Sequence, residues 1–489
     1  MDETQPLLAS ANILVPEQPQ TTGQRIIEFH PDGDSENPLE WKKPYKWFIV
    51  LLLAFMAFTV TFTCIGVVPV AGRIVEDLDG RPSKSASVLL VTIWELGEAA
   101  GPLLIAPLSE LYGRYPVFNV ANILFIVGVA ITALSENSHV FIFARFLTGI
   151  AVASNVLNPA IIGDMFPSEE RGSGMSLIML APLLGGAVGP AIAGAIAESS
   201  GWRRIMWMSL ILASVAELAF LTLFRETYKV PILQRKAARL RQETGDESLK
   251  TAFDNEVSEV ESALWNSIMR PSKVFLGSPV LQIMSLYGGV VFSFFYIMST
   301  TLPDILQDIY EFPPALTGTS FMTFSVGSTI GVIVCNLLLD RIYVRMGNEN
   351  DGKLEPENRL PLVIFGAFCL PAIITLYGFI AQEHWPVALM LISVGALGFL
   401  VILGLVPVMS YVVDAFGLYS ASAMTAVLIT RCLMGTFMPL ATAPLTNKLG
   451  YGFGFLVLAS LVLVVAPIPV FVMRYGARWR SRSEYSKGD

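Results

Sequence analysis

Residues 181–197, APLLGGAVGPAIAGAIA, place glycine and proline in a membrane-length segment where an ordinary spanning helix would carry leucine. Gly185 and Gly189 are four residues apart, a spacing that lets a neighbouring helix approach closely. Pro190 follows them, removes one backbone donor and weakens the helix locally. The stretch predicts a helix that packs tightly and also bends, as a moving part requires. A helix that only packs is the alternative, because glycine and proline are common in spanning helices.

The composition indicates a polytopic membrane protein. The chain has 489 residues, of which 53% are hydrophobic and 15% charged, so it is too apolar for a soluble core. About 20 apolar residues cross a bilayer, and twelve such segments fall into two sets of six, within 47–224 and 277–474. We expect an all-α membrane protein with two pseudo-symmetric six-helix bundles. The remaining segments are a disordered cytoplasmic tail (1–46), a cytoplasmic central loop with an amphipathic helix at the membrane surface (225–276) and a second tail (475–489).

The positive charges predict which side of the membrane each loop faces. With both termini in the cytoplasm, the cytoplasmic segments hold 24 of the 32 lysines and arginines. This bias is the usual determinant of topology.

Several classes of function lack supporting residues. The four cysteines lie inside predicted spans, with no disulfide framework and no metal-ligand spacing, and the three histidines lie in the tail or in loops. Walker and nucleophile-elbow motifs are absent. The net charge of −8 is dispersed and disfavours nucleic-acid binding. We therefore expect no enzyme activity, no metal and no cofactor.

An internal repeat supports two related halves. Gly97 and Gly101 are followed nine residues later by Glu110, and the second half repeats that spacing with Gly327, Gly331 and Asp340. Two further pairs, Asp164 with Pro190 and Asp414 with Pro439, have nearly equal separations. Such parallel repeats are typical of rocking transporters with a substrate site between the halves.

Other motifs follow the same order. Residues 94–118, WELGEAAGPLLIAPLSELYGRYPVF, end in a turn at Gly113 and Arg114, where glycine takes a positive backbone dihedral without strain. Residues 144–155, ARFLTGIAVASN, carry Arg145 and Asn155 on one helical face. Asp164 and Arg171 then lead into the glycine-rich span, which ends at Gly201-Trp202-Arg203.

Together these motifs resemble the major facilitator superfamily, and most of all its fungal polyspecific drug:proton antiporters, over residues 37–483. The chain departs from the superfamily's loop motif because Ala106 replaces a glycine and Glu110 an aspartate, as in the fungal branch. The resemblance implies a conformational role for Ala106, Glu110, Gly113, Arg114, Asp164, Arg171, Gly185, Gly189, Pro190, Asp340, Asp414 and Pro439.

Charges inside the spans are the candidates for proton coupling and substrate binding. Each costs roughly 2.5–3.5 kcal/mol at a helix centre, so it faces a cavity or a partner by default. Glu95 and Glu98 share one face of span 2, and Arg145 is their expected partner. Burial favours the uncharged carboxyl, which can then exchange a proton. A permanent ion pair that only fixes the helices is the alternative. The full candidate set is Glu95, Glu98, Arg145, Asn155, Glu217 and Arg431.

Span 7 carries a polar and aromatic stripe at spacings of three and four residues, which defines one helical face. It predicts a wet cavity lined by Gln282, Ser285, Ser293 and Tyr296, although serine also joins helices by hydrogen bonds.

We therefore expect a monomeric secondary transporter in the lipid bilayer that exports small amphipathic organic compounds, such as drugs, toxins or secondary metabolites, in exchange for protons. The first alternative is a proton-coupled or facilitative uptake carrier for a nutrient or polyamine, and the second is a membrane receptor without transport. The plasma membrane is the expected location, with the vacuolar membrane as the alternative.

Overall fold

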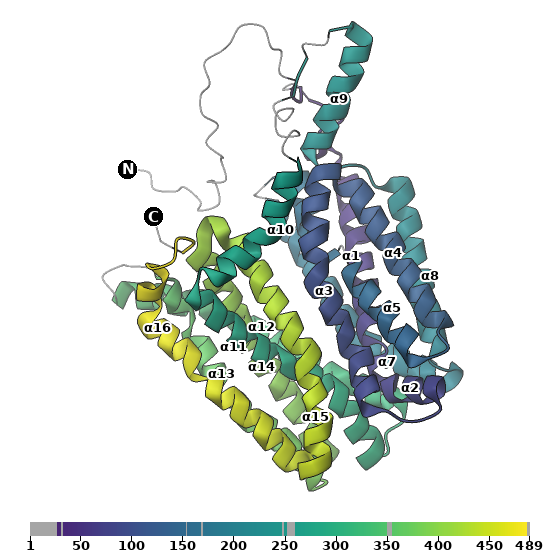
Figure 1. The fold of residues 1–489 in the computed structure, drawn as a ribbon, viewed down its shortest axis with the longest axis vertical. Helices are drawn as coiled ribbons and strands as arrows, with labels where there is room; N and C mark the ends of the chain where they lie inside the picture. The colour runs from purple at the N-terminus through teal and green to yellow at the C-terminus, as the bar shows by residue number, and fades with distance from the viewer. Residues whose placement is uncertain are drawn as a thin grey trace.

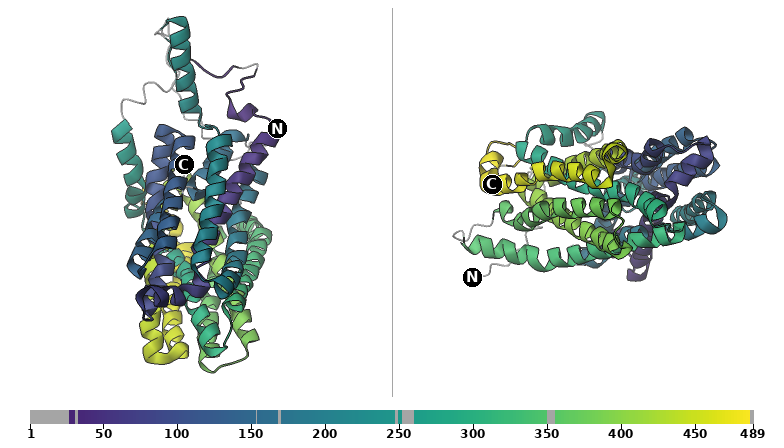
Figure 2. Two further views of the ribbon diagram at one scale, coloured as in Figure 1. Left: turned by 90° about the vertical axis from the view of Figure 1, so that its right-hand side faces the viewer. Right: turned by 90° about the horizontal axis from the view of Figure 1, so that it is seen from below.

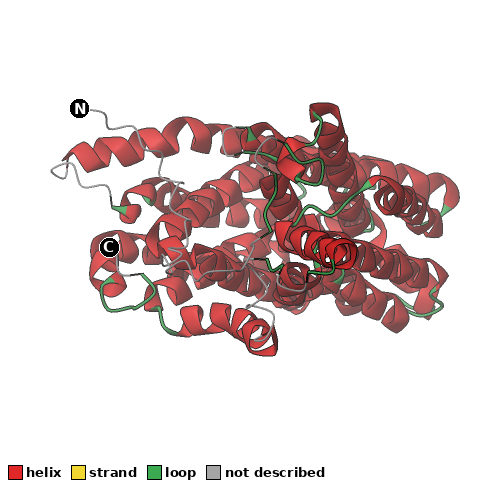
Figure 3. Cartoon of the chain, turned by 90° about the horizontal axis from the view of Figure 1, so that it is seen from above, coloured by secondary structure: helices red, strands yellow, loops and turns green. Residues whose placement is uncertain are grey.

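The computed structural model describes residues 27–30, 33–152, 154–167, 170–246, 249–251, 260–349 and 355–486. This part of the chain is helical nearly throughout (Figure 3). Within it, nine stretches are long and apolar enough to cross a membrane, and one of them, Val387–Arg480, contains several successive helices.

The first half forms one bundle, on the right of Figure 1. Its long helices are α1 (Lys43–Ile65), α3 (Lys84–Tyr112), α4 (Arg114–Leu134), α5 (Ser138–Ile150) with α6 (Ser154–Met165), α7 (Arg171–Ser200) and α8 (Arg203–Leu223). The short η2 (Val68–Val70) and α2 (Ala71–Asp79) lie at one end of it. Side-chain caps begin several helices; for example, the Ser83 hydroxyl accepts a hydrogen bond from the Ala86 amide at the start of α3.

The second half repeats the arrangement. Its helices are α11 (Pro279–Asp304), α12 (Pro314–Glu349), α13 (Pro361–Gln382), α14 (Val387–Phe416), α15 (Ser420–Val465) and α16 (Pro467–Arg480). A π-helical turn, η4 (Ile305–Ile309), extends α11, and η5 (Pro356–Arg359) precedes α13. All twelve expected membrane segments therefore coincide with helical stretches.

A sharp break separates the last two spans, 420–443 and 453–473. It lies at Gly450 within α15, where the backbone is not helical and takes φ 77°. Glycine is suited to this left-handed conformation because it has no Cβ. Helix α16 then continues to Arg480, so the first residues of the expected C-terminal tail are helical.

The glycine repeat has a structural cause in both halves. A Cβ on Gly97 would lie 2.3 Å from the Phe146 carbonyl oxygen of α5, and one on Gly327 would lie 1.8 Å from the Gly395 carbonyl oxygen of α14. Each glycine stripe thus lets two helices of the same half pack backbone to backbone. The internal symmetry expected from the sequence is present in the packing.

The segment between the halves contains α9 (Lys229–Thr244) and α10 (Val260–Leu276). Helix α9 is the expected amphipathic helix, but it projects beyond the bundles along their long axis instead of lying across their ends (Figures 1 and 2). Ala237, on the apolar side of α9, packs against Ile27 and Leu249 instead of against lipid. We call this end of the molecule the α9 end and the opposite one the α2 end.

The expectation of disorder across 1–46 is wrong for its last part. Residues 38–40 form η1, and ion pairs hold the preceding residues on α9: Lys236 lies 2.5 Å from Asp34, and Arg239 lies 2.9 Å from Glu36. Residues 1–26 lie outside the described part of the chain.

Candidate functional site

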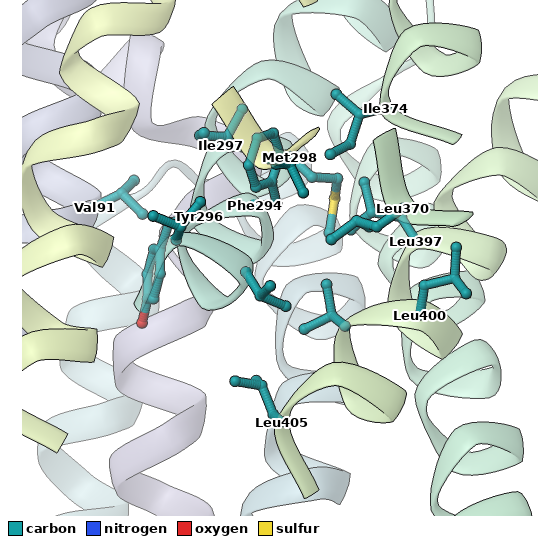
Figure 4. Packing of buried hydrophobic residues seen from close by; sticks show 14 of the residues in the cluster. Val91, Phe294, Tyr296, Ile297, Met298, Leu370, Ile374, Leu397, Leu400 and Leu405 are labelled. Atoms are coloured by element: carbon teal, nitrogen blue, oxygen red, sulfur yellow. The ribbon is translucent and has the colours of Figure 1, made fainter. Parts of the chain in front are cut away.

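A charged cluster joins the two halves at mid-depth. Glu95 and Glu98 project from α3 of the first half, and both are buried, with 2% and 6% of their surface exposed. The Tyr296 hydroxyl of α11 donates to Glu95 Oε1 over 2.7 Å. Arg431 of α15 lies 3.8 Å from Glu98 Oε1. In Figure 4, Tyr296 points away from the apolar side chains of the second half and toward the side of Val91, a residue of α3.

The geometry of α3 explains why the two glutamates lie here. Gly97 and Gly101 face α5 within the first half, whereas Glu95 and Glu98 lie on another face of the same helix and meet α11 and α15. The sequence predicted that the glycines and the glutamates lie on separate faces of this helix.

The expected pairing of these glutamates with Arg145 is wrong in this structure. Arg145 is 1% exposed, and its three guanidinium nitrogens donate to the backbone carbonyl oxygens of Thr63, Cys64 and Leu90 at 2.7–3.3 Å. Helix α1 ends at Ile65, so Thr63 and Cys64 belong to its last turn, where carbonyl groups lack helical partners. Arg145 therefore caps α1, and Arg431 is the cation of the cluster.

Arg431 is held by an aromatic ring as well as by charge. Its guanidinium carbon lies 4.2 Å from the centre of the Phe292 ring, within the range of a cation–π interaction. Two buried polar atoms of the cluster, Arg431 Nε and Glu95 Oε2, have no hydrogen-bond partner. Such atoms are costly in a dry interior, so they are available to a ligand or a proton.

The cluster also brings one sulfur close to the carboxylates. Ligand atoms of Glu95, Glu98 and Cys432 lie within 4.8 Å of one another. Because Arg431 already supplies a positive charge beside Glu98, this arrangement fits a guanidinium better than a metal ion.

The four predicted residues of the polar stripe of α11 make different contacts. The Gln282 amide donates to the Phe275 and Leu276 carbonyl oxygens at the end of α10, which corrects its assignment as a cavity residue. Ser293 donates to the Val290 carbonyl and faces Met438 of α15, so it packs between helices. The Ser285 hydroxyl is buried without a partner. Only Tyr296 of the four predicted residues reaches the charged cluster.

Glu217 lies apart from the cluster. It is buried between α8 and α4, where one oxygen accepts a hydrogen bond of 2.8 Å from Asn122 and the other has no partner. The side chain of Asn155 lies outside the part of the molecule that the structure describes.

A polar network joins the helices of the first half at its α9 end. Arg114 donates to Asp164 over 3.4 Å and to the Ser109 hydroxyl over 2.5 Å. Glu226 accepts from the backbone amides of Arg114 and Tyr115, at 2.8 and 3.2 Å, and so caps α4. A Cβ on Gly113 would lie 2.3 Å from that carboxylate, so the close approach requires glycine as well as its positive φ of 100°.

Sequence reasoning missed the role of Glu226. An acidic residue at the start of a loop gives no local signal of capping a helix that lies 111 residues earlier in the chain. Of the other motif residues, Arg171 donates to the Gly163 and Phe166 carbonyl oxygens at the end of α6. Ala106 and the exposed Glu110 lie in α3, and Pro439 is buried in α15.

The second half has a matching network. Arg359 contacts both Asp414 and Asp340, the latter at 3.1 Å, and Arg480 forms a two-pronged ion pair with Glu357 at 2.8 Å. These ion pairs, like that of Arg114 with Asp164, each join residues of a single half.

At the α2 end, polar contacts cross between the halves. The Gln307 amide donates to the Pro69 carbonyl over 2.8 Å, the Ala315 backbone amide donates to Glu198 over 3.2 Å, and Lys84 lies 3.7 Å from Asp304. The structure is therefore closed between the halves at its α2 end.

Glycines bring α7 and α12 together in this closure. A Cβ on Gly194 would lie 2.2 Å from the Pro314 carbonyl oxygen, and one on Gly318 would lie 2.0 Å from that of Pro190. By contrast, Gly185 and Gly189 face Phe58 and Phe62 of α1, inside the first half. The glycine-rich motif of α7 thus packs on two sides. Gly185 and Gly189 meet α1 of the same half, and Pro190 meets α12 of the other half.

Comparisons with known proteins agree with this architecture. The family model of the Major Facilitator Superfamily matches residues 47–439. The chain is 34% identical over 464 residues to the "Efflux pump radE" of Floropilus chiversii, covering 94% of this chain and 86% of that protein. It is 33% identical over 453 residues to the "MFS transporter cpaT" of Aspergillus oryzae, covering 92% and 91% of the two chains. Among solved structures, the xylose transporter XylE from E. coli in a partially occluded inward-open conformation aligns with a TM-score of 0.63 at 16% identity, over 88% of this chain and 98% of that one.

Proposed function

Because this chain belongs to the major facilitator superfamily, and is therefore a multi-pass membrane transporter related to fungal efflux pumps, we propose that it exports amphipathic organic compounds in exchange for protons. The single observation that carries the proposal is the charged cluster between the halves, in which each glutamate of α3 contacts a residue of the second half.

The cluster links the protonation state of α3 to the contact between the halves. Only the carboxylate form of Glu98 attracts Arg431, and at 3.8 Å the attraction is on the order of 4 kcal/mol at an effective dielectric constant of about 20, before the desolvation of both groups is counted. Protonation removes this attraction. It also weakens the bond from Tyr296, because a charged acceptor binds a hydroxyl more strongly than a neutral one.

The coupling follows from where these contacts lie. They cross the same interface that is closed at the α2 end by Lys84 with Asp304 and by Gln307 with Pro69. Loss of the central attraction favours separation of α3 from α11 and α15. Proton uptake by the cluster therefore favours the arrangement that is open at the α2 end.

Two observations support export as the direction of transport. The α9 end carries the arginine networks of both halves, and the excess of lysine and arginine in the loops at this end favours the cytoplasm. The relative from Floropilus chiversii is named an efflux pump. We further propose a functional monomer in the plasma membrane, with residues 225–276 in the cytoplasm and the vacuolar membrane as the alternative location.

A transport assay tests the proposal. Purified protein in liposomes receives a pH step, and the accumulation of two fluorescent amphipathic compounds, the cation rhodamine 6G and the anion 1-anilinonaphthalene-8-sulfonate, is followed with protein-free liposomes as the control. Accumulation of either compound against its gradient only while the pH step lasts supports antiport. Equilibration of both without accumulation contradicts it and favours a facilitative carrier, and binding without flux favours a receptor.

A further inference from the structure

A second feature of the interface between the halves is a cavity of about 210 Å³ that lies beside the charged cluster. Its walls come from α1 and α7 of the first half and from α11, α12 and α14 of the second. We call it the phenylalanine pocket, because four of its wall residues are Phe292, Phe295, Phe321 and Phe324.

The pocket is built for a flat, apolar group. The rings of Phe295 and Phe324 lie 5.0 Å apart, and those of Phe292 and Phe295 lie 6.2 Å apart, distances at which aromatic rings attract one another. A drug-sized ligand occupies about 300–1,000 Å³, so the pocket has room for a ring system but not for a whole molecule of that size. The rest of a ligand has to extend beyond it.

Two unpartnered polar atoms lie in the pocket wall or next to it. Ser328 lines the pocket, is 3% exposed, and has a hydroxyl without a hydrogen-bond partner. Arg431 lies against Phe292, one of the pocket walls, and its Nε is likewise buried without a partner. Both atoms can donate a hydrogen bond to an oxygen.

A positively charged ligand is served less well. The free oxygen of Glu95 faces the backbone of α15, since a Cβ on Gly435 would lie 3.6 Å from it, whereas Arg431 contacts a wall residue of the pocket, Phe292. Glu98 is already paired with Arg431. A ligand ring packed against Phe292 therefore has the guanidinium of Arg431, and not a carboxylate, on the other side of the Phe292 ring.

We propose that the phenylalanine pocket and Arg431 together bind an aromatic organic acid, with its rings among the phenylalanines and its anionic oxygen on Arg431 Nε. This deepens the proposed function and rests on it, because the compound bound here is the one exported. Glu98 faces Nη2 of Arg431, whereas the unpartnered atom is Nε, so the anion can bind without displacing Glu98.

Equilibrium binding tests the assignment without any gradient. Three probes with the same ring system are titrated onto purified protein in lipid nanodiscs by calorimetry, with empty nanodiscs as the blank: 2-naphthoate, 2-naphthalenemethanol and 2-naphthylmethylammonium. The expected order of affinity is the anion, then the alcohol, then the cation. The charge-assisted hydrogen bond makes the anion about tenfold tighter than the alcohol.

Matched variants separate the parts of the site. Phe324→Ala lowers the affinity for the anion and for the alcohol alike, and Ser328→Ala lowers both affinities to a smaller extent. Arg431→Gln removes the tenfold preference for the anion over the alcohol. Because Arg431→Gln leaves Glu98 buried without its cation, the double variant Glu98→Gln with Arg431→Gln is tested as well. Phe379→Ala, in a different aromatic pair on the second half, is the control and leaves all three affinities unchanged.

Three results would overturn the proposal: tighter binding of the ammonium probe, unchanged affinity for 2-naphthoate in Phe324→Ala and in the Glu98→Gln/Arg431→Gln double variant, or no binding of any probe to the unaltered protein. Binding as expected, together with failure of the pH-driven transport assay, would contradict proton antiport and leave this binding site in place.

Discussion

The hydroxyl of Tyr296 and the carboxylate of Glu95 form a hydrogen bond of 2.7 Å between residues 201 positions apart, one in each half of the chain. The ion pair of Glu98 with Arg431 crosses the same interface between the halves, from α3 to α15. The interface between the halves therefore has a polar, titratable centre, and the α2 end closes beyond it through backbone contacts and one exposed ion pair.

Arg145 should behave as a structural residue and not as a coupling residue. Arg145→Met leaves the last-turn carbonyl groups of α1 buried without donors, so we expect a loss of stability of about 3 kcal/mol or more. Thermal unfolding of the purified protein, followed by tryptophan fluorescence, measures this. The comparison is the double variant Glu98→Gln/Arg431→Gln, which removes both charges of a pair and should unfold closer to the unaltered protein. Equal stability of Arg145→Met and the parent would show that the cap is dispensable.

Bulk at Gly318 should prevent closure of the α2 end. A side chain there collides with the Pro190 carbonyl, so Gly318→Val shifts the protein toward the arrangement that is open at this end. A cysteine introduced at Val88, which lines a cavity of about 410 Å³ at the α2 end, should then react faster with a maleimide. Gly172→Val is the control, because a Cβ at Gly172 meets no atom within 4 Å. An unchanged labelling rate in Gly318→Val would mean that this contact does not govern the closure.

The topology predicts that α9 lies in the cytoplasm. Gln242 is exposed near the end of α9, so a cysteine placed there should resist an impermeant thiol reagent in intact cells and react after permeabilisation. The native thiols are a small background, since three of them are buried and Cys369 is half-buried inside α13. Labelling of Gln242→Cys from outside would reverse the orientation and the proposed direction of transport.

The contact between the N-terminal segment and α9 has a defined pH dependence. The hydrogen bond from Lys236 lowers the pKa of Asp34 below its ordinary value of 3.8. A carboxyl whose pKa is lowered on folding stabilises the contact above its ordinary pKa and loses that stabilisation as the pH falls through the lowered value. The contact is therefore constant around neutral pH and weakens only in acid.

Hydrogen exchange of residues 33–40 measures this contact. Asp34→Asn should increase the exchange rate at neutral pH, with a loss of about 1–2 kcal/mol for a partly buried charged hydrogen bond. Glu36→Gln, which removes the more exposed pair with Arg239, should have a smaller effect. Equal exchange in the parent and in Asp34→Asn would show that the segment is held by other contacts.

Much of the fold followed from local rules. Span length and the repeated glycine spacing depend on residues close together in sequence, and each predicted a feature that the helices of the two halves display. The separation of the Gly97 face from the Glu95 face also followed, because the angle per residue of a helix is fixed.

The partners of the charged residues did not follow from the sequence. The choice between Arg145 and Arg431 depends on how deep each lies and which way its helix is turned, and both are arginines in apolar helices. The sequence does not show which carbonyl groups bind Arg145, because every residue has a backbone carbonyl. The stripe of α11 was expected to line a cavity, but Gly289 and Ser293 of that face pack on α15.

The central claim is that protonation of Glu95 and Glu98 controls the contact between the halves, and a distance measurement tests it without a substrate. Spin labels on cysteines at Arg81 and Glu383, exposed residues of opposite halves at the α2 end, report the separation by double electron–electron resonance. We expect longer distances to become more populated as the pH falls from about 8 to about 5, because a protonated glutamate no longer attracts Arg431. The double variant Glu95→Gln/Glu98→Gln should give the same distribution at both pH values. A pH-dependent shift that persists in this variant, or no shift in the parent, would contradict the claim.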